Sequence, residues 1–574
     1  MQLIKPSPIA VATLATLLSA CGGGKGDDPA PIPAVKVSAI ALSKATPQAI
    51  AENELQFDGG VCSGGSGDLT ASWDFGDKTP ASTSNTHTYV TGDASYTVKV
   101  TCTDAAGNKG EGKNIFTVAH ASMNGFLGKK WSTYTRIPAL HPSVYPVAGL
   151  STAGDIHGVG VPSAASGLDV AAMSANFGIS NEIGYDKLPT GTDKPPFNDT
   201  LEGMRTASID LAVSPNGRVM AAWMAGTSVW YATKNGLKGV WSVPVKIDVP
   251  VLDESIKVVV NDAGAGAIAY CTRTGAQIVT YASQTTQAPV TISKQCGGID
   301  KDEKSLQRYR AFDIAIDNTS STIYAAGVND AATAGKSVVT MKSYTSGSGW
   351  TAATAVSNEL ATPPVSLSYS RSPNGNFAIL AWNQLGTVAP FKSNVFTRIH
   401  ASATWGVIKP VQDNFITKDY ARPLVAINDS GDAFLAMRLG ESNDSGTTFT
   451  SKIEVSNYAA NATAPAWSQP YQLVRNGSAV QFSATDIAID KWGTGLITLA
   501  DGSNPVQVGT FSKTASWSGF SDISPRFPNP KAFHYQTMRA LPDGRAILVT
   551  SVYDDKTPLT DSTAPISSGY VLLK

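Results

Sequence analysis

The stretch Ser208-Ile-Asp-Leu-Ala-Val-Ser-Pro-Asn-Gly-Arg-Val-Met-Ala-Ala-Trp223 contains the pattern that decides the fold. A short, mostly apolar run comes first, a Pro-Asn-Gly turn follows, and a second run of small apolar residues ends at an aromatic residue. Two apolar runs joined by a tight turn of this type are typical of a β-hairpin. We therefore expect an antiparallel pair of strands over these residues.

The same pattern returns, with changes, along most of the chain after residue 125. Its other copies lie at 147–161, 257–270, 312–326, 366–382, 424–437, 486–499 and 537–549. Two further strand-like segments follow most copies, and the last of them opens with tryptophan. Successive units start roughly 50–60 residues apart, which suits four-stranded propeller blades with variable loops. The sequence thus predicts an all-β chain whose larger part, 123–574, is a β-propeller.

The number of hairpins favours eight blades, with seven as the alternative if the weak first copy is only a loop hairpin. The last unit contains a hairpin at 535–551 and a third strand at 569–574, and then lacks its fourth strand. Segment 130–137 carries the tryptophan-led pattern of an outer strand, so we expect it to complete the last blade and remove free sheet edges. We expect the tryptophans that open outer strands to pack between blades: Trp131, Trp241, Trp350, Trp405, Trp467 and Trp517.

The composition limits the classes of partner. Charged residues make up 16% of the 574 residues, and the formal net charge is −1. A chain of this length exceeds one hydrophobic core, so several domains or a repeat array are expected. A net charge near zero provides no basic surface for nucleic acid, and we expect no nucleic-acid partner.

The N-terminus has the features of an export signal. Residues 1–20 contain one basic residue, Lys5, and an apolar run that is too short to span a bilayer, and they end at Leu18-Ser-Ala before Cys21. This pattern resembles a bacterial lipoprotein signal peptide. The resemblance implies acylation of Cys21. It also implies that Gly22, the residue after this cysteine, permits sorting of the lipoprotein to the outer membrane. Residues 21–35 then form a flexible tether. An ordinary secretory signal is the alternative.

The cysteine count agrees with lipidation, because five cysteines minus Cys21 leave four. Cys62 and Cys102 lie in one small domain, and Cys271 and Cys296 lie in one propeller repeat. An oxidising compartment favours two disulfides within these pairs. A metal site is the rival interpretation, but no pair has ligand spacing and no histidine lies near one, so we expect no metal.

Residues 36–120 form a separate unit of alternating strands. Its motifs Trp73-Asp-Phe-Gly-Asp77, Thr86-His-Thr-Tyr89 and Tyr96–Asp104 resemble the PKD domain, an immunoglobulin-like β-sandwich. The resemblance implies a spacer or adhesion module. Lys78 stands where the family usually has a second glycine, so the turn there is expected to differ. Calcium is the one cofactor we consider, with three candidate ligands that also suit solvated turns: Asp74, Asp77 and Asp104.

The candidate binding residues lie within or just after the longest polar inserts of the propeller, at 189–206, 295–311, 412–421 and 523–533. Such loops precede the innermost strand of a blade, so their side chains are expected to converge on one mouth of the channel and form an anion or sugar-acid site. The alternative is that each satisfies loop carbonyls or an acid on its own blade. The candidates are Arg205, Arg308, Tyr309, Arg310, Tyr420, Arg422, His534 and Tyr535.

One short stretch, Tyr134-Thr-Arg-Ile-Pro-Ala-Leu140, is similar to the Tyr-Arg-Ile-Pro motif of sialidases, whose arginine clamps a substrate carboxylate. It has an inserted Thr135, and the Asp-box repeat of that family is absent. The six histidines show no metal-ligand spacing, and the chain has no nucleophile elbow, phosphate loop or dinucleotide fingerprint.

These observations favour a monomeric lipoprotein anchored at the bacterial outer membrane. We expect its propeller to bind a glycan or protein partner without catalysis. The alternative is an exported polysaccharide-acting enzyme, a sialidase-like hydrolase or a lyase, with its site at the channel mouth. Two convergent carboxyls beside arginines would favour the enzyme. A flat apolar face would favour a third role, as a subunit of an outer-membrane assembly.

Overall fold

The chain divides into two compact units, residues 1–120 and 121–574, and each is described by itself. No helix in the described part of the chain is long and apolar enough to cross a membrane. The computed structural model describes residues 32–43, 49, 51, 54–89, 94–118, 125–136, 143–162, 170–176, 179–189, 209–225, 228–248, 251–282, 285–297, 310–385, 393–401, 403–412, 422–442, 449–462, 465–475, 478–479, 483–501, 504–512, 517–523, 533–553 and 566–574.

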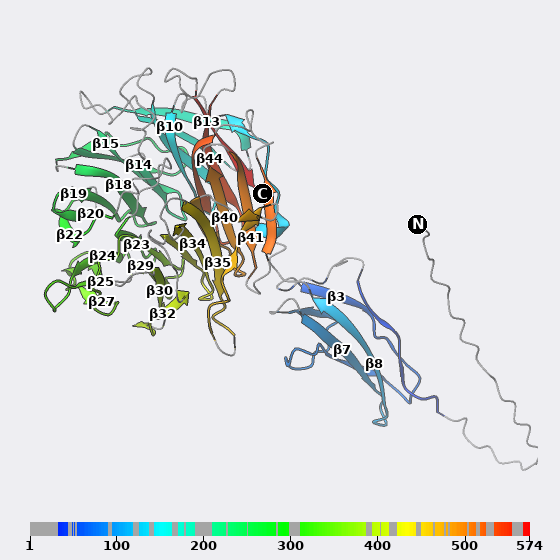
Figure 1. Ribbon diagram of the computed structural model, residues 1–574. Helices are drawn as coiled ribbons and strands as arrows, with labels where there is room; N and C mark the ends of the chain where they lie inside the picture. Colours follow the sequence, from blue (N-terminus) through cyan, green and yellow to red (C-terminus); the bar gives the residue numbers. More distant parts are fainter. Residues whose placement is uncertain are drawn as a thin grey trace, which may run out of the picture. The chain divides into compact units, whose positions relative to one another are not determined.

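The described residues of the first unit form two three-stranded sheets, β2-β3-β6 and β5-β7-β8, and a two-stranded sheet, β1-β4 (Figure 1). Alternating residues of β7 are buried, as the period-two pattern predicts. The strands are β1 (Lys36–Val37), β2 (Ile40–Leu42), β3 (Glu54–Gly59), β4 (Cys62–Ser63), β5 (Thr70–Asp74), β6 (Thr86–Thr88), β7 (Ala94–Thr103) and β8 (Lys109–Val118).

Aromatic side chains form the core of the first unit. Phe57 lies against Trp73 and Phe75, with ring centroids 6.2 and 5.7 Å away. The buried hydroxyl of Tyr89 donates to the Phe75 carbonyl at 3.0 Å, which satisfies the polar end of an otherwise apolar core residue. Lys78 has φ 69°, the left-handed conformation that glycine adopts most easily. The backbone therefore keeps a glycine-type turn despite the lysine.

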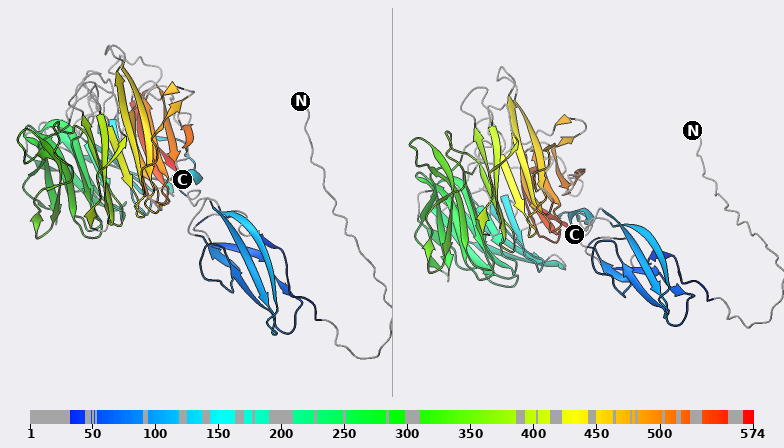
Figure 2. Two further views of the ribbon diagram at one scale, coloured as in Figure 1. Left: turned by 60° about the horizontal axis from the view of Figure 1, so that its bottom comes forward. Right: turned by 90° about the horizontal axis from the view of Figure 1, so that it is seen from below.

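Eight sheets of four or five strands follow one another in the described part of the second unit, from cyan to red in Figure 1 and from two other sides in Figure 2. Strands that are consecutive in the chain pair antiparallel within each sheet. In the third, fourth and fifth sheets, an additional strand also pairs with the third strand. The exception to chain order is the last sheet, where β45 pairs with β9 from the start of the unit.

The strands of the first four sheets are β10 (Ser143–Leu150), β11 (Asp155–Pro162), β12 (Val170–Asn176), β13 (Ile179–Leu188); β14 (Ile209–Val213), β15 (Arg218–Ala225), β16 (Ser228–Asn235), β17 (Val245–Ile247); β18 (Val251–Val260), β19 (Gly266–Thr272), β20 (Gly275–Ala282), β21 (Thr285–Thr286), β22 (Val290–Ser293); β23 (Phe312–Ile316), β24 (Ile323–Asp330), β25 (Ser337–Thr345), β26 (Gly349–Trp350) and β27 (Thr354–Ala355).

The strands of the last four sheets are β28 (Leu367–Arg371), β29 (Phe377–Leu385), β30 (Ser393–Ala401), β31 (Thr404–Trp405), β32 (Lys409–Gln412); β33 (Arg422–Ile427), β34 (Ala433–Ser442), β35 (Phe449–Tyr458), β36 (Tyr471–Gln472); β39 (Ser483–Ile489), β40 (Gly495–Asp501), β41 (Asn504–Phe511), β42 (Trp517–Asp522); β43 (Phe533–Ala540), β44 (Ala546–Tyr553), β45 (Ile566–Leu573) and β9 (Thr135–Arg136). A two-stranded sheet, β37 (Val474–Arg475) and β38 (Ser478–Ala479), and a short 3₁₀ helix, η2 (Phe126–Gly128), complete the described elements.

Apolar layers fill the spaces between neighbouring sheets. Second strands such as β19 are buried on both faces, because each sheet packs against the one before and the one after. Five of the six predicted tryptophans belong to or pack against these layers, and the side chain of the sixth, Trp517, lies outside the described residues. The five are Trp131, Trp241, Trp350, Trp405 and Trp467.

Most first strands end in a turn whose first residue supplies a side-chain oxygen. In the turn Ser214-Pro-Asn-Gly217, the Gly217 N–H donates to the Ser214 carbonyl at 2.9 Å, and the Arg218 N–H donates to the Ser214 hydroxyl at 3.0 Å. Gly217 has φ 85°, which explains the glycine. The same side-chain bond to the N–H four residues later is made by Ser151, Asn261, Asn428 and Asp490.

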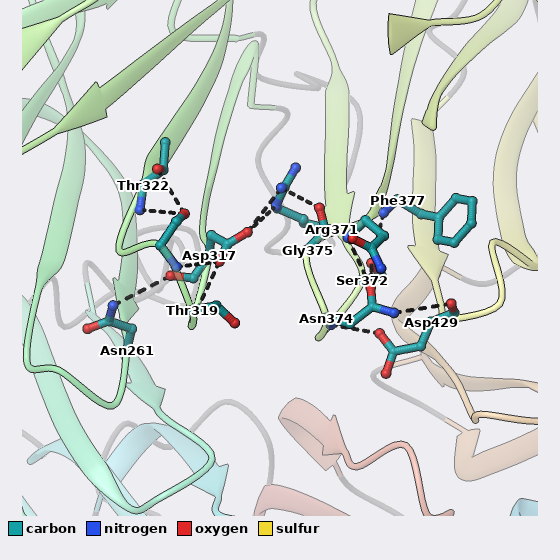
Figure 3. Close-up of polar contacts among 12 residues, drawn as sticks. Asn261, Asp317, Thr319, Thr322, Arg371, Ser372, Asn374, Gly375, Phe377 and Asp429 are labelled. Atoms are coloured by element: carbon teal, nitrogen blue, oxygen red, sulfur yellow. Dashed lines mark hydrogen bonds and ion pairs between the residues drawn. The ribbon is translucent and has the colours of Figure 1, made fainter. Parts of the chain in front are cut away.

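Hydrogen bonds join the turns of successive sheets (Figure 3). Asp317 illustrates this: its carbonyl accepts from the Asn261 amide, and its carboxylate accepts from the Arg371 guanidinium at 3.0 Å. The last sheet is joined to the first in the same way. The joined pairs are Thr152–Pro215, Asn216–Asp262, Asp262–Asn318, Asp317–Arg371, Asn374–Asp429, Asn428–Asp490, Lys491–Pro542 and Arg545–Thr152.

First strands of successive sheets also contact one another, and β10 of the first sheet contacts β43 and β44 of the last, where the cyan and red ends meet in Figure 1. In the last sheet, Lys130 and Lys574 exchange backbone hydrogen bonds, and Ser132 N–H donates to the Leu572 carbonyl. The pairing of β9 with β45 therefore continues outward as far as the C-terminal residue.

Candidate functional site

Charged side chains meet where the first strands lie side by side. Four of them occupy one position of the repeat, four residues before the first residue of the turn: Asp210, Lys257, Asp313 and Asp486. The fifth, Arg539, lies on β43 two residues before its turn. We refer to these five residues, from five different sheets, as the charge cluster.

The carboxylates of the charge cluster accept hydrogen bonds from backbone N–H groups. Each accepts, through Oδ2, the N–H of a residue on the first strand of the next sheet, at 2.8–2.9 Å. The bonds are Val258 to Asp210, Tyr369 to Asp313 and Met538 to Asp486. First strands are edge strands whose N–H groups would otherwise lack acceptors inside the protein. Each bond therefore fastens one sheet to the next.

The second oxygens of these carboxylates lie near cations. Arg539 reaches two acids, with Nη2 3.4 Å from Oδ1 of Asp210 and Nη1 3.6 Å from Oδ1 of Asp486. Lys257 Nζ lies 3.8 Å from Oδ1 of Asp313. One guanidinium thus lies between a carboxylate of the second sheet and one of the seventh. These two residues, Asp210 and Asp486, are 276 positions apart in the sequence.

Asp486 is the member of the cluster whose acidity is perturbed. Burial raises the pKa of Asp486 above its ordinary value, while Arg539 and the Met538 N–H oppose the change. Its side chain is 27% accessible. Asp486 therefore holds its proton to higher pH than a solvated aspartate.

Of the eight binding residues predicted from the sequence, one is described with its side chain. Arg310 precedes β23 of the fourth sheet, and its Nη1 donates to the carbonyl of Ile256, in β18 of the third sheet, at 3.3 Å. The other seven lie outside the described residues, by side chain or entirely, so their convergence stays a prediction. The backbones of Arg422, His534 and Tyr535 lie in β33 and β43, whereas Arg205, Arg308, Tyr309 and Tyr420 are not described at all.

The two predicted cysteine pairs are disulfides, Cys62–Cys102 and Cys271–Cys296. The first joins β4 to β7, and the second joins β19 to the segment after β22. Cys21 and the signal segment lie outside the described residues.

The three candidate calcium ligands accept hydrogen bonds from nearby turns. Asp104 accepts from the N–H groups of Ser66 and Asn108, and Asp77 is paired with His87 Nε2 at 2.7 Å. Asp74 accepts from Gly76 within its own turn. Within the described ranges, no group of three or more His, Cys, Asp or Glu side chains is arranged to hold a metal.

The arginine of the sialidase-like stretch, Arg136, lies in the outermost strand of the last sheet, where it pairs with Gly569. That strand position matches the assignment of this segment to an outer strand. It places the backbone of Arg136 away from the first strands and from the charge cluster.

The charge cluster was not predicted from the sequence, although the repeats contain a signal for it. When the eight copies are aligned on their turns, the position four residues before the turn holds Asp, Lys, Asp and Asp in four of the apolar first strands. The position two residues before the turn holds a small or apolar residue in seven copies and Arg539 in the eighth. A charge at a fixed position of an apolar repeat strand is a signal that loop-based reasoning passes over.

Part of the chain matches a known protein family. Residues 40–119 match the family model described as the PKD domain. Residues 40–119 of the first unit therefore form a PKD domain, and the second unit has β-propeller architecture. No curated protein matches the chain.

Three solved structures illustrate what the chain is similar to in fold. The Dos1 propeller has 11% identity and a TM-score of 0.43, with 78% of this chain and 96% of that chain covered. An α-L-arabinofuranosidase from Fusarium graminearum has 13% identity and a TM-score of 0.32, with 56% and 94% covered. An α-L-arabinanase from Penicillium chrysogenum has 13% identity and a TM-score of 0.33, with 64% and 93% covered.

Proposed function

We propose that this chain is an outer-membrane lipoprotein whose eight sheets close into an eight-bladed propeller that binds a glycan or protein partner without catalysis. Three features support closure: the eight turn-to-turn hydrogen bonds, the contact of β10 with β43 and β44, and the pairing of β9 with β45. In this arrangement the charge cluster lines the central channel. The lipid on Cys21 and the tether 21–35 would attach the protein to the membrane.

The observation that carries binding is the accessibility of the charge cluster. The side chains of Lys257, Arg539 and Asp486 are 30%, 34% and 27% accessible, whereas those of Asp210 and Asp313 are 10% and 15% accessible. Accessible polar side chains that converge from several elements can contact a small ligand. Among the two kinds of partner we favour a glycan, because five polar side chains from five sheets suit a small ligand better than a flat protein surface.

A glycan-array screen tests this function. The fragment 26–574 is used, because it contains every residue that the structure describes. Binding to specific glycans, lost in Arg539→Met and Asp486→Ser, would support it. The absence of binding to every glycan, with the protein folded, would contradict it. Labelling with a radioactive fatty acid, lost in Cys21→Ala, tests the anchor separately.

An exported polysaccharide-acting enzyme is the second candidate, and one observation favours it. Asp210 and Asp486 lie within reach of one guanidinium, and the pKa of Asp486 is raised, as suits a general acid beside a second carboxylate. Release of reducing sugar from a bound polysaccharide, abolished in Asp486→Asn with binding retained, would establish catalysis. Retention of an intact ligand after prolonged incubation would leave the binding function alone.

A further inference from the structure

We propose that acid loosens two of the contacts between sheets of the second unit, because each contact encloses a histidine beside a positively charged side chain. One contact joins the first and second sheets around His157, and the other joins the fourth and fifth sheets around His400. We refer to them as the His157 seam and the His400 seam. These are the two histidines of the second unit whose side chains lie within the described residues.

A chain of hydrogen bonds crosses the His157 seam. Nδ1 of His157 lies 3.1 Å from the hydroxyl of Ser174, and Lys234 of the second sheet donates to the same hydroxyl at 2.7 Å. All three residues are buried. The Ser174 oxygen accepts from the ammonium, so its single hydrogen can point to His157 only while Nδ1 carries no proton. The chain therefore suits the neutral imidazole.

Protonation of His157 would disrupt this chain. Nδ1 would then need an acceptor, but the Ser174 oxygen already accepts from Lys234, and two positive charges would face one hydroxyl. The opposite ring nitrogen, Nε2, is buried and has no hydrogen-bond partner among the described residues. A charged ring would thus be both repelled and incompletely hydrogen-bonded in the closed seam.

Two acids lie near this chain. The carboxylate of Asp186 lies 3.8 Å from Lys234, and its side chain is 42% exposed, so water weakens its effect. Asp155, two residues before His157 on β11, accepts from the Asn176 amide at 3.0 Å. Despite these acids, burial and the Lys234 ammonium lower the pKa of His157.

The His400 seam also encloses a ring nitrogen that lacks a partner. Nδ1 of His400 is buried and makes no hydrogen bond to another described residue. The ring lies against Trp405, with centroids 5.3 Å apart, and Trp405 packs against the apolar layer between the fourth and fifth sheets. Protonation would place a buried N–H donor there without an acceptor.

Two guanidiniums share the His400 seam. Arg371 donates to the Asp317 carboxylate of the fourth sheet at 3.0 Å. Arg398, two residues before His400 on β30, donates to a carbonyl just after β27 of the fourth sheet at 2.9 Å. Burial and the Arg371 guanidinium lower the pKa of His400, while a hydrogen bond with the Ala403 backbone opposes the change. Both seams therefore combine burial, a neighbouring cation and an unpartnered ring nitrogen.

Separation of the sheets relieves this conflict, because water then hydrates both charges and the free N–H group. A histidine whose pKa is lower in the closed form stabilises that form above its ordinary pKa of about 6.5, and this contribution is lost as pH falls. The seams should therefore be closed at neutral pH and loosen below about pH 6.

The positions of the two seams have a consequence for binding, which rests on the proposed closure of the ring. In a closed ring of eight sheets, the two seams separate the second, third and fourth sheets from the other five. A ligand held by side chains of both groups would lose part of its contacts in acid. The loosening itself needs neither a closed ring nor a ligand, so it is tested without them.

The test is hydrogen exchange of residues 26–574 at pH 7 and pH 5, measured by mass spectrometry with fragmentation that resolves single amides. The rates are corrected for the pH dependence of the chemical exchange step. Two backbone hydrogen bonds report on the seams, because each crosses one of them. Thr152 N–H donates to the Pro215 carbonyl across the His157 seam at 2.9 Å, and Leu367 N–H donates to the Arg310 carbonyl across the His400 seam at 2.9 Å.

We expect corrected exchange at Thr152 to rise at least about tenfold between pH 7 and pH 5, and exchange at Leu367 to rise at least about twofold. The internal reference is the Lys294 N–H, which donates to the Val328 carbonyl between the third and fourth sheets at 2.8 Å. Its corrected exchange should stay unchanged.

Variants assign each effect to its histidine. His157→Asn keeps a polar group beside Ser174 but cannot be protonated, so exchange at Thr152 should lose its rise while exchange at Leu367 keeps it. His400→Gln should give the reverse result, with loss of the rise at Leu367 alone.

Lys234→Met provides an independent variant of the His157 seam. It removes one of the two charges that face Ser174, so the rise at Thr152 should shrink although His157 is retained. The matched control is His87→Gln in the PKD domain, which should change neither reporter.

Three outcomes would overturn the inference. An equal rise at Lys294 would show that acid loosens the whole unit and not two seams. A rise at Thr152 that persists in both His157→Asn and Lys234→Met would assign it to other groups. The absence of any rise at Thr152 and Leu367 at pH 5 would show that the seams stay closed in acid.

Discussion

The carboxylate of Asp490 accepts the backbone N–H of Phe126 at 3.3 Å, across 364 residues of sequence. Its other oxygen accepts the N–H groups of Trp492 and Thr494 in its own turn, at 3.0 and 2.8 Å. The Phe126 side chain is buried in the apolar layer between the last two sheets. The segment that enters the second unit is thus fastened to the turn of the seventh sheet.

Asp490 should make stability depend on pH. Burial raises the pKa of Asp490 to about 7 from an ordinary value of 3.8, and its N–H donors oppose this only in part. The folded state therefore keeps a proton that the unfolded state loses, so this group's contribution to stability is lost as pH rises from about 4 to 7. At about 1.4 kcal/mol per pKa unit, the loss is at most about 4 kcal/mol.

Asp490→Asn should remove this dependence, since asparagine occupies the same turn position as Asn261 and Asn428. Melting temperatures between pH 4.5 and 7.5 measure the effect. Asp248→Asn, at a carboxylate that is 82% exposed, is the control and should leave the profile unchanged. An unaltered slope in Asp490→Asn would show that Asp490 does not titrate in this range.

His157 should make the protein sensitive to acid. Its side chain is fully buried, and burial together with the nearby Lys234 ammonium lowers the pKa of His157 to about 3. The folded state holds the imidazole neutral, so stability present above pH 6.5 is lost as pH falls toward 3. His157→Asn should flatten this acid limb while costing about 1–3 kcal/mol at neutral pH for the lost ring. Urea unfolding at pH 4, 5, 6 and 7 measures both effects, and an equally steep acid limb in the variant would count against it.

The fold could be predicted from the sequence because its evidence is local and repeated. A turn such as Ser214–Gly217 needs left-handed glycine and a side-chain oxygen, and both are visible in most copies. The pairing of β9 with β45 could be inferred from a missing strand at one end and a surplus one at the other. The PKD domain was evident from its aromatic and acidic motifs.

The site was harder to predict, because it depends on which strand faces are brought together. Arg539 bonds Asp210, 329 residues away, and no local pattern joins these two positions. Loop polarity led to residues such as Arg310, whose guanidinium donates to a neighbouring carbonyl. Only the arrangement of first strands reveals that charges at one repeat position are neighbours.

Two glycines with positive φ allow a matched test of close packing. A Cβ on Gly544 would lie 2.5 Å from the backbone of Gly125, next to the segment fastened by Asp490, whereas one on Gly335 would meet nothing within 4 Å. Gly335→Ala should cost about 1 kcal/mol for its φ of 77° alone. Gly544→Ala should cost the same plus the displacement of the entering segment. Equal melting temperatures for the two variants would indicate that the segment at Gly125 shifts without a measurable loss of stability.

Arg371 should be the most important single link between turns. It donates to the Asp317 carboxylate and the Gly375 carbonyl (Figure 3). It is nearly buried and lies 4.2 Å above the Tyr324 ring. Arg371→Met would leave a nearly buried carboxylate without its cation, and we expect a loss of about 3–5 kcal/mol in the free energy of unfolding.

The double variant Arg371→Met/Asp317→Asn should recover part of that loss, because it also removes the stranded charge. Arg371→Lys should lose an intermediate amount, since an ammonium cannot make the forked contacts of a guanidinium. Lys336→Met, in an exposed pair, should cost no more than about 1 kcal/mol. Chemical denaturation of the four variants measures these differences. A cost for Arg371→Met as small as that of Lys336→Met would mean that the turns are held together by their backbone and amide bonds alone.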